Sequence, residues 1–331
     1  MVDRASLPQP QELVAHLREY IDWAVEQNGG LTKAEKPGHR QPFHWPPHPI
    51  SYSYHVLAGD WTGSASFEAH DESFPVEVAR TPFGVFGRST TLWHDARGET
   101  EEEMLANLKT AAEPLFRRQL AISECLGLSG RFKGHIDELG PESDIKLLYC
   151  RDRDVANDAR IQIETRASYG VFGPALIEIL LDRKHPFRRS AQWCVLDLFE
   201  DIESFFPTAD EQRPAVAAMK GLLWDAEDDY ARTIYKAGVV LGGHLPDEQG
   251  GDVLLECLDA PSKIGRRAAI HGLFHVVEWF PHRKEEVLRA LSGSSENDPE
   301  EILREYARGM SEDIRMGNYD HVGEPRFEEE N

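Results

Sequence analysis

The chain has 331 residues, 40% of them apolar, which is enough for two domains or for one domain followed by a repeat array. Its 36 Lys and Arg residues are outnumbered by 58 Asp and Glu residues, so the formal net charge is -22. A surface this acidic repels a phosphate backbone, and no stretch approaches the ~18 uninterrupted apolar residues that span a bilayer. We therefore expect neither a nucleic-acid partner nor a membrane partner.

The cysteines and the N-terminus indicate the compartment. The four cysteines lie far apart and lack the spacing of a metal site: Cys125, Cys150, Cys194 and Cys257. Free thiols suit a reducing compartment. Residues 1–10 lack the basic segment followed by an apolar run that marks a signal peptide. We expect a cytoplasmic protein.

The first 50 residues predict one helix followed by a strap rich in Pro and His. Apolar residues recur at helical spacing over residues 11–27, and Asn28-Gly29-Gly30 ends the pattern. Residues 31–49 contain closely spaced Pro, Gly and His, which is typical of an extended connection. We expect the aromatic residues of this strap to pack against a neighbouring surface, and a metal site formed by its histidines is the alternative.

Residues 51–170 predict an α+β domain. Short, partly alternating segments over residues 61–70, 74–80 and 84–93 are typical of strands. Alternation of apolar and polar residues returns within residues 145–165 and predicts two more strands. A helix pair across this last segment is the alternative.

A long helix is predicted to follow the first three strands. Thr100 and Glu103 have the spacing of a capping box, in which the hydroxyl and the carboxylate each accept a hydrogen bond from a free backbone amide. Pro114 lies inside the helical pattern and predicts a kink, because proline has no amide proton to donate.

The strands and helix start over residues 74–108 are similar to a known strand-to-helix corner. Two strands followed by the run from Gly98 to Leu108, GETEEEMLANL, resemble this corner in HicB-type antitoxin domains. The resemblance implies that residues 50–130 fold alone and bind a small basic protein.

After Gly173-Pro174 the strand signals stop and pairs of helices recur. The turns within the pairs begin at Asp182, Asp225, Asp259 and Ser292, with spacings of 43, 34 and 33 residues. These spacings fall in the range of helical repeats. The short first helices are predicted over residues 175–181, 214–224, 252–258 and 284–291, and the last long helix over residues 303–314.

Two of the longer helices share one template. Arg188-Arg189-Ser190-Ala191 opens the first, Arg266-Arg267-Ala268-Ala269 opens the third, and apolar residues follow both at the same offsets. Helices that share one template predict a stacked repeat, which is an architecture, and say little about which reaction or ligand the protein has.

The repeated segment resembles a HEAT repeat. In that family an Asp in the turn and an Arg early in the second helix form a ladder between adjacent repeats. The matching positions are Asp182 with Arg188, Asp225 with Arg232 and Asp259 with Arg266. The fourth unit lacks the Asp, which suits a capping repeat. The resemblance implies a HEAT-like, all-α solenoid over residues 171–317 that binds other macromolecules, followed by a charged tail over residues 318–331.

The outward face of the longer helices is the candidate site. A helix advances 100° per residue, so the positions opposite the apolar stripe follow from the template. They are Trp193, Asp197, Glu200, Lys236, His271, His275 and Glu278, with Phe274 nearby. In HEAT-like arrays this face commonly lines the concave surface, so the resemblance implies an acidic groove. Trp193 is the expected anchor, because buried aromatic residues dominate interface energetics.

Three residues of this face are candidate metal ligands. His271 and His275 are one helical turn apart, and Glu278 shares their face, so two imidazoles and a carboxylate lie within reach of one divalent ion. Ordinary solvated side chains are the alternative, and in that case no cofactor is expected.

These observations favour a non-enzymatic interaction or scaffold protein. We expect it to bind a basic protein or peptide through the acidic groove of a HEAT-like solenoid that follows an α+β domain. The alternatives are a metal-dependent or lyase-like enzyme on the solenoid, and the antitoxin-like binding module upstream.

Overall fold

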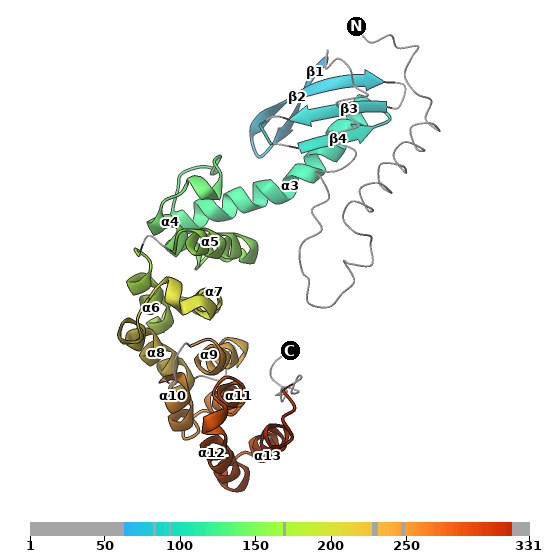
Figure 1. Cartoon of the computed structure of the whole chain (residues 1–331). Helices are drawn as coiled ribbons and strands as arrows, with labels where there is room; N and C mark the ends of the chain where they lie inside the picture. Colours follow the sequence, from blue (N-terminus) through green and yellow to red (C-terminus); the bar gives the residue numbers. More distant parts are fainter. Residues whose placement is uncertain are drawn as a thin grey trace. The chain divides into compact units, whose positions relative to one another are not determined.

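The computed structural model describes residues 63–81, 84–89, 91–92, 94–167, 170–226, 231–245 and 249–319 (Figure 1). The helix and strap expected over residues 1–50, and nearly all of the charged tail, lie outside these residues. The chain forms two compact units, which divide between Arg117 and Arg118. Among the described residues, none of the helices has the length and apolarity that crossing a bilayer requires.

The first unit contains a four-stranded antiparallel sheet whose strands pair in chain order. The strands are β1 (Gly63–Ala69), β2 (Glu72–Thr81), β3 (Gly84–Ser89) and β4 (His94–Gly98). Ala69 pairs with Glu72, so β1 and β2 are joined by the two-residue turn His70-Asp71. Both turn residues have positive φ, 49° and 62°, as the type I′ turn of a hairpin requires. The first two predicted strands are confirmed, the third ends at Ser89 and not at residue 93, and β4 was not predicted.

Helix α3 (Glu101–Leu126) covers the sheet with its first half. Phe74, Val76 and Val78 alternate along β2 and form a core with Met104 and other residues of α3. A Cβ on Gly98 of β4 would lie 2.4 Å from the backbone nitrogen of Met104, so only glycine permits this approach of helix to sheet.

The start of α3 matches half of the predicted capping box. The Thr100 hydroxyl accepts a hydrogen bond from the amide of Glu103 at 3.2 Å. The Glu103 carboxylate accepts from the amide of Glu99 at 2.9 Å, one residue before the expected donor. The helix continues past Pro114 to Leu126.

The two strands predicted within residues 145–165 are helices, so that prediction was wrong. The segment forms α4 (Pro141–Leu147) and α5 (Arg153–Thr165). Val155, Ala159 and Ile163 are 0% exposed at a spacing of four, whereas Ile161 is 40% exposed, so the apolar period is helical. These helices join the core of the second unit, which is why the compact units divide near residue 117 and not near residue 170.

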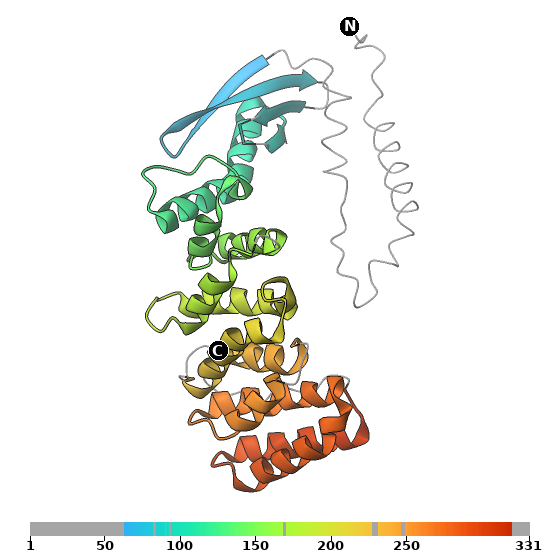
Figure 2. The same cartoon turned by 60° about the vertical axis from the view of Figure 1, so that its left-hand side comes forward.

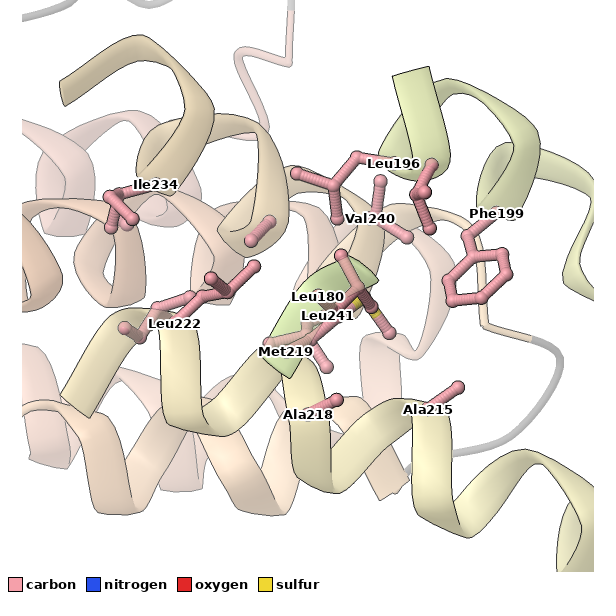
Figure 3. Close-up of a cluster of buried hydrophobic side chains, with 14 of the residues drawn as sticks. Leu180, Leu196, Phe199, Ala215, Ala218, Met219, Leu222, Ile234, Val240 and Leu241 are labelled. Carbon is pink, nitrogen blue, oxygen red and sulfur yellow. The ribbon is translucent and has the colours of Figure 1, made fainter. Parts of the chain in front are cut away.

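Four helix pairs follow, as the sequence predicts, and they succeed one another in chain order in both views of the second unit (Figures 1 and 2). The first helices of the pairs are α6 (Gly173–Leu181), α8 (Ala209–Trp224), α10 (Gln249–Cys257) and α12 (Lys284–Asn297). The second helices are α7 (Arg188–Leu198), α9 (Ala231–Gly243), α11 (Lys263–Trp279) and α13 (Glu301–Met316). One continuous core joins them. Figure 3 shows Leu180, Met219 and Leu241 meeting between three of these helices.

Helices α9 and α11 approach each other through glycine. A Cβ on Gly242 would lie 2.1 Å from the backbone oxygen of Gly272, and one on Gly272 would lie 2.5 Å from the oxygen of Gly238. The two backbones are therefore in direct contact, which no larger residue allows at these positions.

An ion pair of the kind that the ladder predicts joins the third and fourth helix pairs, whereas Asp225 pairs with Arg183 and not with the predicted Arg232. Arg266 of α11 donates to both carboxylate oxygens of Asp298, at 2.7 and 3.2 Å. Asp298 lies in the turn between α12 and α13, because α12 continues past Ser292 to Asn297. The expectation that the fourth unit lacks the ladder Asp was wrong for that reason.

Candidate binding face of the second helices

Five helices of the second unit form one row. Helix α5 contacts α7, α7 contacts α9, α9 contacts α11, and α11 contacts α13. We call the outward side chains of this row the second-helix face. Every site residue predicted from the sequence lies on α7, on α9, on α11 or in the 3₁₀ turn Phe199–Ser204 that continues α7.

The first group of side chains on this face is the Trp193 cluster, formed by Arg160, Trp193, Asp197, Glu200 and Lys236. The Lys236 ammonium contacts the Asp197 carboxylate, lies 2.9 Å from Glu200 Oε1, and stands 4.6 Å from the centre of the Trp193 ring. Arg160 of α5 adds a second cation, 3.9 Å from Asp197. The structure thus brings together four of the predicted site residues.

The charges within the Trp193 cluster are largely balanced. Lys236 and Arg160 face Asp197 and Glu200, so these carboxylates are not the open acidic surface that the sequence implied. Burial, and then the nearby Arg160 guanidinium, lower the pKa of Lys236 to about 8. Lys236 is therefore charged at neutral pH and loses its charge as the pH rises through about 8.

The second group is the histidine cluster, formed by Tyr235, His271, His275, Glu278 and Tyr306. His271 Nδ1 lies 2.8 Å from the Tyr306 hydroxyl, and His271 Nε2 lies 2.7 Å from the Tyr235 hydroxyl. The Nε2 atoms of the two histidines are 3.2 Å apart. His275 Nδ1 lies 3.1 Å from the Glu278 carboxylate.

A consistent set of protons can be assigned to this chain of groups. The ionised Glu278 carboxylate only accepts, so His275 carries its proton on Nδ1 and presents a lone pair at Nε2. His271 then carries its proton on Nε2, where the Tyr235 oxygen at 2.7 Å and His275 Nε2 at 3.2 Å are both acceptors, and its Nδ1 accepts the proton of the Tyr306 hydroxyl. The arrangement is a continuous hydrogen-bonded path from a buried tyrosine to a half-exposed carboxylate.

Two residues predicted for an open groove are buried instead. His271 is 7% exposed and Phe274 is 2% exposed. The Tyr306 ring of α13 is parallel to the His271 ring within 3°, and the Tyr319 ring lies 5.3 Å from that of Phe274. The helical template placed His271 opposite the core stripe of α11 and Phe274 near it, but α13 and the residues after it cover both side chains.

The three candidate metal ligands do not converge on one point. Glu278 contacts Nδ1 of His275, whereas His271 lies beside Nε2 on the other side of the same ring. No group of three His, Cys, Asp or Glu side chains in the described part of the chain is arranged to hold a metal ion.

Sequence reasoning missed several members of the face. Tyr235 precedes Lys236, a position that the template selected, and Tyr306 lies on the last long helix, from which no site residue was predicted. Trp279, which follows Glu278, is 64% exposed. A Cβ on Gly243 of α9 would lie 3.6 Å from His275 and 3.8 Å from the Trp279 indole nitrogen, so Trp279 lies beside α9 on this face.

Comparison with known proteins adds little to this description. The chain matches no protein-family model and no curated protein. Among the solved structures it is similar to a designed armadillo repeat protein in complex with the peptide (KR)4, with 17% identity and a TM-score of 0.36, over 63% of this chain and 93% of that chain. An overlap this low does not establish a shared fold, so the proposals below rest on the residues of this chain.

Proposed function

We propose that the second unit is a HEAT-like solenoid that binds a basic segment of a partner protein through the second-helix face. The Trp193 cluster carries this proposal. It is a half-exposed indole beside two carboxylates, with an ammonium group held between them. This combination of an aromatic ring with acidic oxygens is the chemistry that recognises a lysine or arginine side chain.

Lys236 acts in this proposal as an internal competitor of the partner. Its ammonium occupies the position between Trp193, Asp197 and Glu200 that a cation from the partner would take. Withdrawing Lys236 leaves Glu200 for the incoming group and leaves Asp197 with only the more distant Arg160, 3.9 Å away. Trp279, at 64% exposure, provides a second aromatic contact on the same face, and the net charge of -22 attracts a basic segment over a longer range.

Binding of an Arg-rich peptide should weaken about tenfold when Asp197 and Glu200 are both changed to Lys, because two attractive contacts become repulsive. Lys236→Met should instead tighten binding, by roughly threefold to tenfold, because the competitor is removed. Fluorescence anisotropy of the labelled peptide, at low and moderate salt, measures both effects. A Glu-rich peptide should bind neither the native protein nor the Lys236→Met variant.

The same experiment has a pH arm and a matched control. Raising the pH through about 8 neutralises Lys236 in the native protein while arginine keeps its charge, so affinity should rise, and this rise should be absent in Lys236→Met. Changing Asp225, which follows α8, and Glu256 of α10 to Lys alters the total charge equally away from the second-helix face and should weaken binding much less. If both double variants lost affinity for the peptide equally, binding would depend only on total charge, and the Trp193 cluster would not be the binding site.

The histidine cluster favours a second candidate function, a divalent metal site. Two Nε2 atoms 3.2 Å apart have nearly the separation of two imidazole ligands on a tetrahedral ion, about 3.3 Å for bonds of about 2.0–2.1 Å. Tyr306 and Glu278 contact the Nδ1 atoms and would orient the two rings, as outer partners of metal-bound histidines do. Metal binding would require His271 to carry its proton on Nδ1, facing Tyr306, and to give up the contact of its Nε2 with the Tyr235 hydroxyl. Glu278 is an orienting group in this arrangement, and water would complete the ligands.

Cobalt(II) titration tests this candidate, because ligation by two imidazoles gives visible absorption bands. One equivalent should bind, His271→Ala with His275→Ala should abolish the bands, and Glu278→Gln should weaken binding about tenfold. His282→Ala serves as the control, since His282 lies outside the cluster. Substoichiometric binding that is unchanged in the double histidine variant would exclude the site.

A further inference from the structure

Two cysteines meet where the end of α3 packs on α4. The Cys125 thiol donates to the backbone oxygen of Lys146 at 3.4 Å, and the Cys150 thiol donates to the oxygen of Ala121 at 3.7 Å. Lys146 is four residues before Cys150, and Ala121 is four residues before Cys125. Each sulfur therefore reaches across to the turn from which the other one projects, which brings the two thiols together.

The two thiols differ in accessibility. Cys125 is half-buried and reachable from solvent, whereas Cys150 is 2% exposed. The other two cysteines, Cys194 and Cys257, are buried, and none of the four forms a disulfide in this structure.

We propose that Cys125 and Cys150 form an oxidation site, which a low-molecular-weight disulfide such as oxidised glutathione converts to an intramolecular disulfide. The acidity of the pair supports this. The neighbouring Cys125 thiol lowers the pKa of Cys150 to about 7, although burial opposes the shift, whereas Cys150 and burial together raise the pKa of Cys125. One proton is thus lost from the pair near neutral pH, while burial raises the pKa of Cys194 and of Cys257 to about 11.

The reaction proceeds by two exchanges. Cys125 first passes its proton to the neighbouring Cys150 thiolate, and the resulting Cys125 thiolate attacks one sulfur of oxidised glutathione and expels a glutathione thiolate, which leaves a mixed disulfide on Cys125. The expelled glutathione thiolate takes the proton from Cys150. The Cys150 thiolate then attacks the Cys125 sulfur and expels the second glutathione thiolate. Two protein thiols are oxidised to one disulfide, and one oxidised glutathione is reduced to two glutathione molecules, which take up the two protons released.

The product ties the last turn of α3 to the segment that enters α5. It closes a loop over residues 126–149, so it restricts the unfolded chain more than the folded one. The oxidised protein should unfold at a temperature about 5–10 °C higher than the reduced protein.

The test is to incubate the full chain with oxidised glutathione and to map disulfides by mass spectrometry of an unreduced digest. We expect one bond, between Cys125 and Cys150, with Cys194 and Cys257 remaining as thiols. The thermal shift should appear in the same sample and vanish on reduction with dithiothreitol.

Single variants separate the two steps. Cys150→Ser should accumulate a stable glutathione adduct on Cys125, because no resolving thiol remains. Cys125→Ser should stay unmodified, since Cys150 is buried, and Cys194→Ser with Cys257→Ser should form the bond as the native protein does. A bond between other cysteines, or an adduct on native Cys125 that is never resolved, would overturn the proposal.

Discussion

Asp298→Ala is expected to lower the free energy of unfolding by about 3–5 kcal/mol. The side chains of Asp298 and Arg266 are 3% and 8% exposed, so the change leaves a buried guanidinium without its counter-ion. The backbone oxygens of Ala260 and Pro261, each 3.0 Å from the Arg266 Nη1, cannot replace the lost charge. Urea denaturation followed by circular dichroism measures the loss.

Two controls isolate the effect of burial. Asp225→Ala breaks the pair with Arg183, whose atoms are 3.4 Å apart and whose side chains are 35% and 64% exposed, and it should cost less than about 1 kcal/mol. The double change Arg266→Met with Asp298→Leu removes both charges and should recover much of the stability lost by Asp298→Ala. If Asp298→Ala and Asp225→Ala lowered the free energy of unfolding equally, the buried ion pair of Arg266 with Asp298 would be contradicted.

Gly242→Ala is expected to destabilise the protein by about 3 kcal/mol or more. The added methyl group would lie 2.1 Å from the backbone oxygen of Gly272, and a backbone cannot rotate away as a side chain can. Helices α9 and α11 would have to separate, and the core that they share would open. Thermal unfolding and the midpoint of urea denaturation both report the change.

Gly309→Ala is the matched control for this substitution. Gly309 also lies inside a helix, but a Cβ there would have no atom within 4 Å. Alanine should therefore raise stability by about 0.5–1 kcal/mol, because it reduces the freedom of the unfolded chain and favours the helix. If both alanine variants were equally stable, the direct backbone contact of α9 with α11 would be wrong.

Local periodicity was sufficient to predict the helix pairs. The positions of α6 to α13 follow from apolar residues at helical spacing and from turns that interrupt them, both of which act over fewer than ~20 residues. The same signal failed over residues 145–165, because the alternation there involves only a few apolar residues and fits a strand and a helix equally well. Only packing against the helical core decided between them.

The candidate site likewise depends partly on the local sequence and partly on how the helices pack. The sequence determined which side chains leave α7, α9 and α11 on the side opposite the core, and so selected Trp193, Asp197, Glu200 and Lys236 together. It could not determine that Lys236 neutralises two of these residues, that α13 covers His271, or that Cys125 meets Cys150. These features depend on the distances between helices, which are set by the packing of side chains and glycines far apart in the chain, whereas the direction of a side chain from its own helix is set by local geometry alone.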